Sequence, residues 1–413
     1  MTNERRLAEH AARQSYGRLL SLLAARTRDV AAAEDALADA FAAALVAWPR
    51  TGAPDNPDAW LFAAAKRKLI DAARRAQTAA QGEAEILRGV EEIEAEMSAE
   101  KAPDHRLGLM FACAHPAIEE GARTPLMLQA VLGFSAERIA AAFLVEPAAM
   151  SQRLVRAKKK IRDAGIGFDV PAAEEWGARF STVLDAIYAA YGVGWSDPLG
   201  LDPGRRDLAE EAIWLASVLA SQLPEEPEVL GLLSLMHHLE ARKPARRDRE
   251  GRYVPLDEQD TTLWRREAIQ EAEMLLRAAS RMQRFGRYQL EAAIQSAHAT
   301  RAFGGGADWS AIALLYEALA ELTGSPVAQL NAAAAIARRD GAALGLVALL
   351  GVIERHPHLQ AYQPYWALRA DICARLGKQD EARACYGEAI AREADGAVIA
   401  FLRRRQSELR DRT

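Results

Sequence analysis

The stretch Gly133–Ile161 reads GFSAERIAAAFLVEPAAMSQRLVRAKKKI and predicts a short apolar helix, a tight turn and a basic helix. Ile139 and Phe143 place an apolar face on the first helix, and residues 144–146 leave room only for a short turn. Pro147 suits the first position of the second helix, because the N–H that it lacks would be unpaired there in any case. Two helices at this spacing are typical of a helix-turn-helix, whose second helix enters the major groove of DNA.

The second helix of this pair has two faces of different chemistry. Met150, Leu154, Ala157 and Ile161 recur at intervals of 4, 3 and 4 residues, which predicts one buried stripe. Residues 151–162 contain six Lys or Arg residues and no acidic residue. This positive charge favours DNA binding, although a charge run is usually only a solvated helix face. The candidate DNA contacts are Ser151, Gln152, Arg153, Val155, Arg156, Lys158 and Lys159.

Length and composition predict an all-α protein of two or three domains. The chain has 413 residues, of which 50% are hydrophobic and 26% charged, and alternating strand-like patterns are scarce. A net charge of -5 and a pI near 6.0 argue against a general nucleic-acid coat, so any DNA contact must come from a local basic patch.

Cysteine and histidine spacing predicts neither a disulfide framework nor a metal site. Cys113, Cys373 and Cys385 form no CxxC pair, which fits a reducing cytoplasm. No His or Cys cluster has the spacing of zinc ligands, and we expect no metal and no cofactor. The longest mostly apolar run, Gly341–Ile353, is too short to cross a bilayer, so we expect a soluble, cytoplasmic protein without membrane contacts.

Composition divides the chain into five segments. They are a helical segment over residues 1–76, an acidic linker over 77–104, a segment with the helix-turn-helix over 105–170, a helical extension over 171–288 and a repeat region over 289–413. In the first segment a loop over residues 49–58 precedes a basic helix that begins at Trp60. The linker has eight acidic residues against two basic ones.

The repeat region resembles tetratricopeptide (TPR) repeats. Gly377, Ala382, Tyr386 and Ala389 fall at the Gly, Ala, aromatic and Ala positions of one such unit, and equivalent positions recur 36 and then 34 residues earlier. Stacked repeats of this kind form a concave helical surface. Plain amphipathic helical hairpins with core alanines would give the same pattern.

Taken together, the first and third segments resemble the two conserved domains of extracytoplasmic-function (ECF) sigma factors. The pattern of sigma region 2 is matched by Asp29, Ala33–Ala36, Asp39, Phe41, Trp48–Pro49, Ala59–Leu61, Ile70–Asp71 and Arg74–Arg75. The pattern of region 4 is matched by Pro116, Arg123, Gly133, Ser135, Glu137, Ile139–Ala140, Arg153–Leu154, Arg156–Ala157 and Ile161. The long tail is similar to that of the ECF subgroup with a C-terminal TPR-like extension.

The resemblance implies two partners, core RNA polymerase, through its clamp helices and flap, and promoter DNA. It implies polymerase contacts at Glu34, Asp35, Leu37, Asp39 and Phe41, although these could also be an ordinary solvated acidic face. It implies contacts with the minus-ten element at Trp60, Lys66, Arg67, Lys68, Arg74 and Arg75, with a core position as the alternative for Trp60. The helix that starts at Pro147 would read the upstream promoter element.

These features predict a sigma factor whose extension regulates it in cis or binds a protein regulator. A helix-turn-helix repressor or activator with a TPR-like sensor domain is the alternative, and it would bind duplex operator by itself. A third interpretation is a scaffold protein built from TPR repeats. We expect no enzymatic activity, because no phosphate loop, metal set or nucleophile–base arrangement has a recognised spacing.

Overall fold

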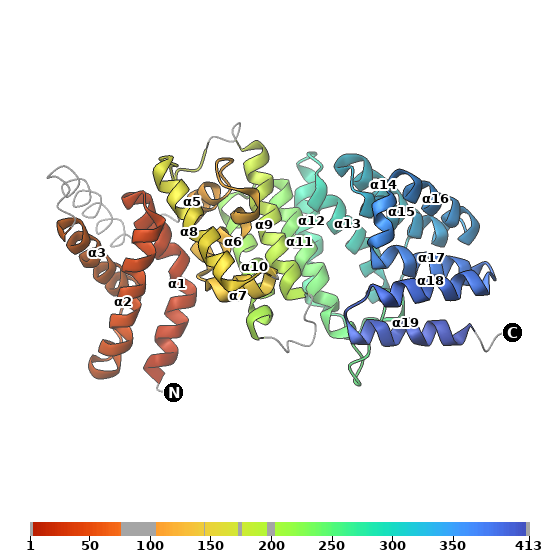
Figure 1. Cartoon of the computed structure of the whole chain (residues 1–413), viewed down its shortest axis with the longest axis horizontal. Coiled ribbons are helices and arrows are strands. Elements are labelled where there is room, and N and C mark those ends of the chain that lie inside the picture. The colour runs from red at the N-terminus through yellow and green to blue at the C-terminus, as the bar shows by residue number, and fades with distance from the viewer. Residues whose placement is uncertain (1–2, 76–104, 144, 172–175, 196–202, 410–413) are drawn as a thin grey trace. The chain divides into compact units, whose positions relative to one another are not determined.

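The computed structural model describes residues 3–75, 105–143, 145–171, 176–195 and 203–409. Within these ranges the regular elements are helices, with one isolated antiparallel bridge between Arg247 and Tyr253, so the predicted all-α class is confirmed (Figure 1). The chain forms two compact units. The first comprises residues 1–194 and 202–212, and the second residues 195–201 and 213–413.

The first unit starts with a bundle of α1 (Asn3–Thr27), α2 (Val30–Thr51) and α3 (Pro57–Arg75). Asp29 sets the start of α2, because its carboxylate accepts hydrogen bonds from the amides of Ala31 and Ala32 at 3.0 and 3.1 Å. Leu37 and Trp48 of α2 are fully buried in the bundle. Their burial fixes which side of α2 faces outward.

The predicted loop over residues 49–58 was wrong at both ends. α2 continues to Thr51 and α3 starts at Pro57, which leaves residues 52–56 between them. Pro49 is tolerated because it lies in the last turn of α2, where a missing N–H removes only one helical hydrogen bond. Gly52 ends the helix with a φ of 82° and donates its amide to the Trp48 carbonyl at 3.0 Å.

The acidic linker predicted over residues 77–104 lies outside the described residues. After it the chain forms α5 (Arg106–Cys113), α6 (Glu120–Leu132), α7 (Ala136–Phe143) and α8 (Pro147–Asp163). Gly133 ends α6 in a left-handed conformation, with a φ of 70°. A Cβ atom at this residue would also lie 2.9 Å from a ring carbon of Tyr16 on α1, so turn geometry and packing both require glycine here.

The helix that follows this group packs against α5. α9 (Gly177–Trp195), up to Gly194, and the first residues of α10 (Pro203–Gln222), up to Ala212, belong to the first unit. The ring centroid of Phe111 on α5 lies 5.8 Å from that of Trp176 and 6.2 Å from that of Phe180. Arg179 also donates to the Phe111 carbonyl at 2.8 Å. This aromatic cluster joins α5 to the start of the predicted extension.

The second unit is a series of helices in which sequence neighbours pack against each other (Figure 1). They are α11 (Pro227–Arg242), α12 (Arg266–Arg281), α13 (Arg287–Ala299), α14 (Trp309–Thr323), α15 (Pro326–Arg339), α16 (Ala342–Arg355), α17 (Gln363–Arg375), α18 (Gln379–Ala391) and α19 (Gly396–Glu408). Ala382, Tyr386 and Ala389 of the predicted repeat are buried in one core with Ala370 and Cys373. The assignment of these helix pairs to TPR repeats stays a prediction.

The polar segment between α11 and α12 contacts α19, a helix that is distant from it in sequence. Arg247 pairs with Asp395 at the start of α19 at 2.5 Å, and Tyr253 contacts the Phe401 ring edge-on at 5.5 Å. Glu258 of the same segment pairs with Arg405 of α19. The segment therefore holds α19 by ion pairs and ring contacts.

Candidate nucleic-acid interface

The buried stripe predicted on the basic helix is confirmed in α8. The helix begins at Pro147, and Met150, Leu154, Ala157 and Ile161 are all buried. Because these four side chains are buried on one side of α8, the side chains on its opposite side point outward. The exposed face of α8 therefore follows directly from its apolar spacing.

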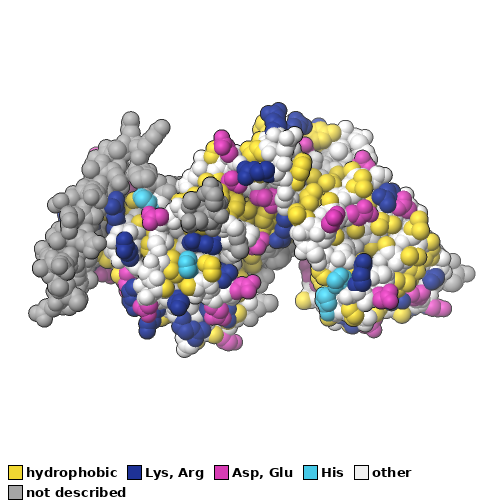
Figure 2. Space-filling view, turned by 90° about the horizontal axis from the view of Figure 1, so that it is seen from above, with side chains coloured by type: hydrophobic (Ala, Val, Ile, Leu, Met, Phe, Trp, Pro, Cys, Tyr) yellow, Lys and Arg dark blue, Asp and Glu magenta, His cyan; other side chains and the backbone are white. Residues whose placement is uncertain are grey.

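The outward face of α8 presents most of the candidate DNA contacts. Gln152, Val155, Arg156 and Lys159 are exposed, and Ser151 is half-buried at their edge. Val155 is 63% exposed, which is high for a large apolar side chain and suits contact with a thymine methyl group. Figure 2 shows Lys and Arg side chains gathered over part of the first unit, on the face that it presents.

Two of the candidate DNA contacts, Arg153 and Lys158, are bound within the protein. Arg153 donates to the Gly121 carbonyl of α6 at 3.3 Å, which ties α8 to α6. Lys158 forms an ion pair with Glu34 of α2, and the two side chains are only 11% and 13% exposed. The structure thus separates Lys158 from the exposed face of α8 and places it against α2.

The predicted polymerase contacts on α2 fall into exposed and buried groups. Asp35 and Asp39 are exposed, and Phe41 is half-buried against the ring of Tyr16 at 6.4 Å. Leu37 lies in the bundle core and Glu34 lies under α8. Of the five predicted polymerase contacts, Asp35, Asp39 and part of Phe41 are therefore accessible to a partner.

The candidate minus-ten contacts lie on α3. Trp60 packs edge-on against buried Trp48, with ring centroids 5.7 Å apart, which favours the core role for Trp60. Arg67 and Lys68 are exposed and Lys66 is half-buried. Lys68 forms an ion pair with Asp39 of α2 at 3.2 Å, and the side chains of both residues are more than half exposed. The side chains of Arg74 and Arg75 lie outside the described residues.

Burial dominates the electrostatics around Glu34. Burial raises the pKa of the Glu34 carboxyl, whereas the charge and hydrogen bond of Lys158 act in the opposite direction. Burial and the nearby Glu34 carboxylate also raise the pKa of Tyr16 and of the Cys113 thiol. A second ion pair joins the same helices, between Arg162 of α8 and Asp29 at 3.3 Å.

Sequence reasoning missed the ion pairs between α2 and α8. Glu34 and Lys158 are 124 residues apart, and no local pattern links positions at that separation. The basic face was identified from helical spacing, and the acidic residues were identified from the resemblance to sigma region 2. Their pairing follows only from the packing of the two helices.

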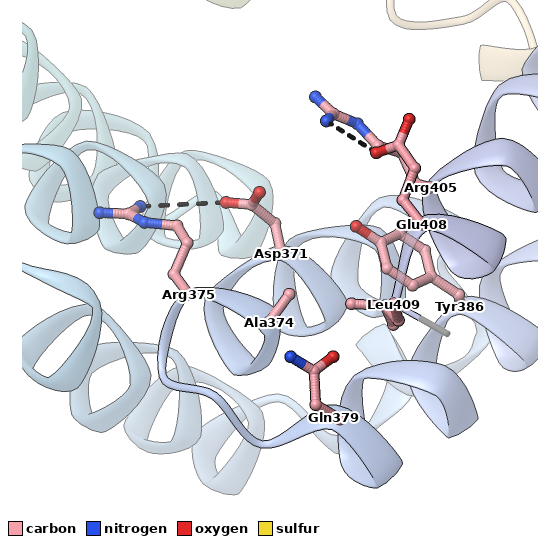
Figure 3. A pocket seen from close by; sticks show the side chains of 8 residues that line it. All are labelled: Asp371, Ala374, Arg375, Gln379, Tyr386, Arg405, Glu408 and Leu409. Carbon is pink, nitrogen blue, oxygen red and sulfur yellow. Dashed lines mark hydrogen bonds and ion pairs between the residues drawn. The ribbon is translucent and has the colours of Figure 1, made fainter. Parts of the chain in front are cut away.

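A polar pocket in the second unit does not offer an unpaired charge to a ligand. It has a volume of about 190 Å³ and is lined by α17, α18 and α19 (Figure 3). Arg375 pairs with Asp371 at 3.9 Å and Arg405 with Glu408 at 3.5 Å, and Tyr386 projects between the two pairs (Figure 3). Arg375 and Arg405 are thus each paired with a carboxylate of the same helix.

Within the described residues, no group of three or more His, Cys, Asp and Glu side chains could hold a metal ion. No described helix is long and apolar enough to cross a lipid bilayer.

Comparison with known proteins identifies two parts of the chain. Residues 11–79 match sigma-70 region 2, and residues 179–280 match a family of unknown function, DUF6596. Over 398 residues the chain is 38% identical to an uncharacterized protein of Rhizobium meliloti (strain 1021), which covers 94% of this chain and 92% of that protein. No solved structure matches the chain. The first match confirms the predicted region 2, whereas region 4 and the ECF subgroup stay predictions.

Proposed function

The chain belongs to the same family as the Rhizobium meliloti protein and contains a sigma-70 region 2, and from this premise we propose that it is a sigma factor of the ECF type. It binds core RNA polymerase and directs initiation at specific promoters. The observation that carries this proposal is the match over residues 11–79, since region 2 is the part of a sigma factor that contacts core polymerase and the minus-ten element.

The exposed charges of the first bundle support separate roles for α2 and α3 in this proposal. Asp35 and Asp39 on α2 offer carboxylates to a basic partner surface. Arg67 and Lys68 on α3 offer cations to DNA phosphates. Polymerase docking is thus assigned to α2 and strand contact to α3.

α8 is the proposed reader of the upstream promoter element. Its exposed Gln152, Val155 and Arg156 suit hydrogen bonds and apolar contacts with base edges in the major groove. Lys159 on the same face suits a phosphate. The packing of α7 against α8 supports the proposed helix-turn-helix.

The extension is proposed to regulate the sigma factor in cis or to bind a protein regulator. The contact of α9 with α5 supports this, because Trp176 and Phe180 pack directly on Phe111 of the sigma-like part. A chain that ends after Ala212 keeps this cluster and removes the second unit. We expect it to differ from the full chain in promoter-dependent transcription, and equal activity at all protein concentrations would contradict cis regulation.

Single-round transcription with purified bacterial core polymerase tests the main proposal. The template is a fragment that spans the promoter of the protein's own operon. Initiation at a defined site should require the protein and should weaken with Arg156→Ala, whereas the control Arg403→Ala, at an exposed position on α19, should have little effect. The alternative, a helix-turn-helix repressor or activator, predicts tight duplex binding without any association with core polymerase.

A further inference from the structure

The outward face of α16 in the second unit is apolar. Leu349 and Val352 are buried on the inner side of this helix, whereas Leu344, Val347 and Leu350 on the outer side are 55%, 69% and 42% exposed. The helix carries no charge before its last two residues, and a helix that is apolar on all sides is normally buried. Figure 2 shows hydrophobic side chains gathered on the face of the second unit that it presents. We therefore expect another surface to cover the outer side of α16.

One glycine of α16 is not explained by packing within the chain. A Cβ atom at Gly345 would lie 2.2 Å from the Cβ of Ala337, so close packing against α15 requires that glycine. A Cβ atom at Gly351 would meet no other side chain and no other described element within 4 Å. Glycine is unfavourable inside a helix, so its presence at an open position indicates that a further backbone approaches α16 there.

The outward residues of α16 are arranged symmetrically about Val347. Leu344 and Leu350 lie three residues before and after it, and two small residues, Ala343 and Gly351, lie four residues before and after it. A two-fold axis through Val347 therefore places each leucine opposite a leucine of a second, antiparallel α16. The same axis places Ala343 opposite Gly351. A two-fold contact between identical chains requires a surface that is complementary to itself in this way.

The charges at the two ends of α16 favour an antiparallel pair over a parallel pair. Arg339 and Asp340, which pair with each other, lie just before the helix, and Glu354 and Arg355 end it. In an antiparallel pair these two ends meet, so the acids of one copy have bases of the second copy within reach. A parallel pair would place Glu354 against Glu354 and Arg355 against Arg355, which is unfavourable.

Exposed apolar side chains next to α16 enlarge this surface. α14 and α16 both pack against α15. Leu314 and Leu322 of α14 and Val327 at the start of α15 are exposed. A specific interface commonly buries about 800 Å² on each partner, which is more than one short helix provides. We therefore expect α14 to contribute at the margin of the contact.

We propose that the outward face of α16 is a self-association site, through which two copies of the chain form an antiparallel dimer with Val347 at its two-fold axis. The proposal goes beyond the proposed function and does not depend on it. The second unit would thereby join two chains, each with its own sigma region 2.

The mass of the full chain, measured by sedimentation equilibrium over a wide range of concentrations, tests the proposal. The wild type should reach the mass of a dimer. Val347→Asp places two carboxylates together at the axis and should raise the dissociation constant at least about 100-fold. The control Met274→Asp changes an equally exposed apolar residue on α12 and should leave the dissociation constant unchanged. Both positions are exposed, so both variants should fold, and circular dichroism checks this.

Gly351→Leu separates close packing from unspecific hydrophobic association. The substitution adds apolar area and removes a glycine from the helix, so unspecific association would become stronger. Close approach of a second α16 leaves no room for the leucine, so the proposed dimer should become weaker. Stronger association of this variant would overturn the proposed packing.

Disulfide cross-linking tests the position of the axis. Val347→Cys should cross-link two copies under mild oxidation, because the two cysteines face each other at the axis. Leu344→Cys should not, because the two copies of this residue are about 9 Å apart along the helices, beyond the reach of a disulfide. The three native thiols are buried, and the unsubstituted chain is the control for their reaction.

Each remaining outcome decides the proposal. A monomer at every concentration would overturn it, and so would a dimer that Val347→Asp leaves intact. Equal cross-linking of Leu344→Cys and Val347→Cys would overturn the antiparallel arrangement. Association with core polymerase is measured separately by co-elution, so a failure of the dimer leaves the sigma factor proposal untouched.

Discussion

Acidification should selectively destabilise the second unit through a buried histidine on α11. His238 is 3% exposed, and burial lowers its pKa to about 3, with the nearby charge of Arg242 acting in the same direction. The carboxylate of Glu273 lies 3.5 Å from Nε2, and the pKa of His238 is lowered despite this neighbour. The same carboxylate already accepts a hydrogen bond from Ser296. The imidazole is therefore neutral in the folded protein.

The sign and size of the effect follow from the two pKa values. The unfolded chain has a histidine pKa near 6.5, so between pH 6.5 and pH 3 it binds a proton that the folded unit does not bind. Stability is fully present above pH 6.5 and is lost as the pH falls. From pH 7 to pH 5, His238 alone should remove about 2 kcal/mol, and His298, with its pKa lowered to about 4, should remove a similar amount.

Hydrogen exchange in α11 measures this loss in the full chain. About 2 kcal/mol corresponds to about 30-fold more frequent opening, after correction for the intrinsic pH dependence of exchange. His238→Leu should remove that share of the pH dependence, whereas the exposed His358→Leu should keep it. Equal pH dependence in the wild type and His238→Leu would refute the assignment.

Three substitutions test other parts of the structure. Arg156→Ala should weaken duplex binding by about 1–3 kcal/mol and relax base preference at one position, measured by titration at fixed salt with variant duplexes. Trp48→Ala should destabilise the first unit by about 3–5 kcal/mol, because the ring is fully buried against Trp60, and urea unfolding would show it. Asp395→Ala should cost about 1–2 kcal/mol, since the carboxylate caps α19 and pairs with Arg247, and exchange of the α19 amides would report it.

The helix positions and the inward faces could be predicted because they depend on residues of one helix. The stripe from Met150 to Ile161 requires no knowledge of its neighbours, and α8 buries all four members. The region 2 match was equally accessible, since its pattern lies within one continuous stretch. Burial that depends on a second helix could not be predicted, and Lys158 was therefore included among the DNA contacts.

The polar segment over residues 243–260 shows the same limit in the second unit. It has no helical period, so the sequence suggested no role for it. In the structure Arg247 and Glu258 reach α19, which lies well over 100 residues further along the chain. The structural role of Arg247 and Glu258 depends on partners that are distant in sequence, and a local pattern does not reveal such partners.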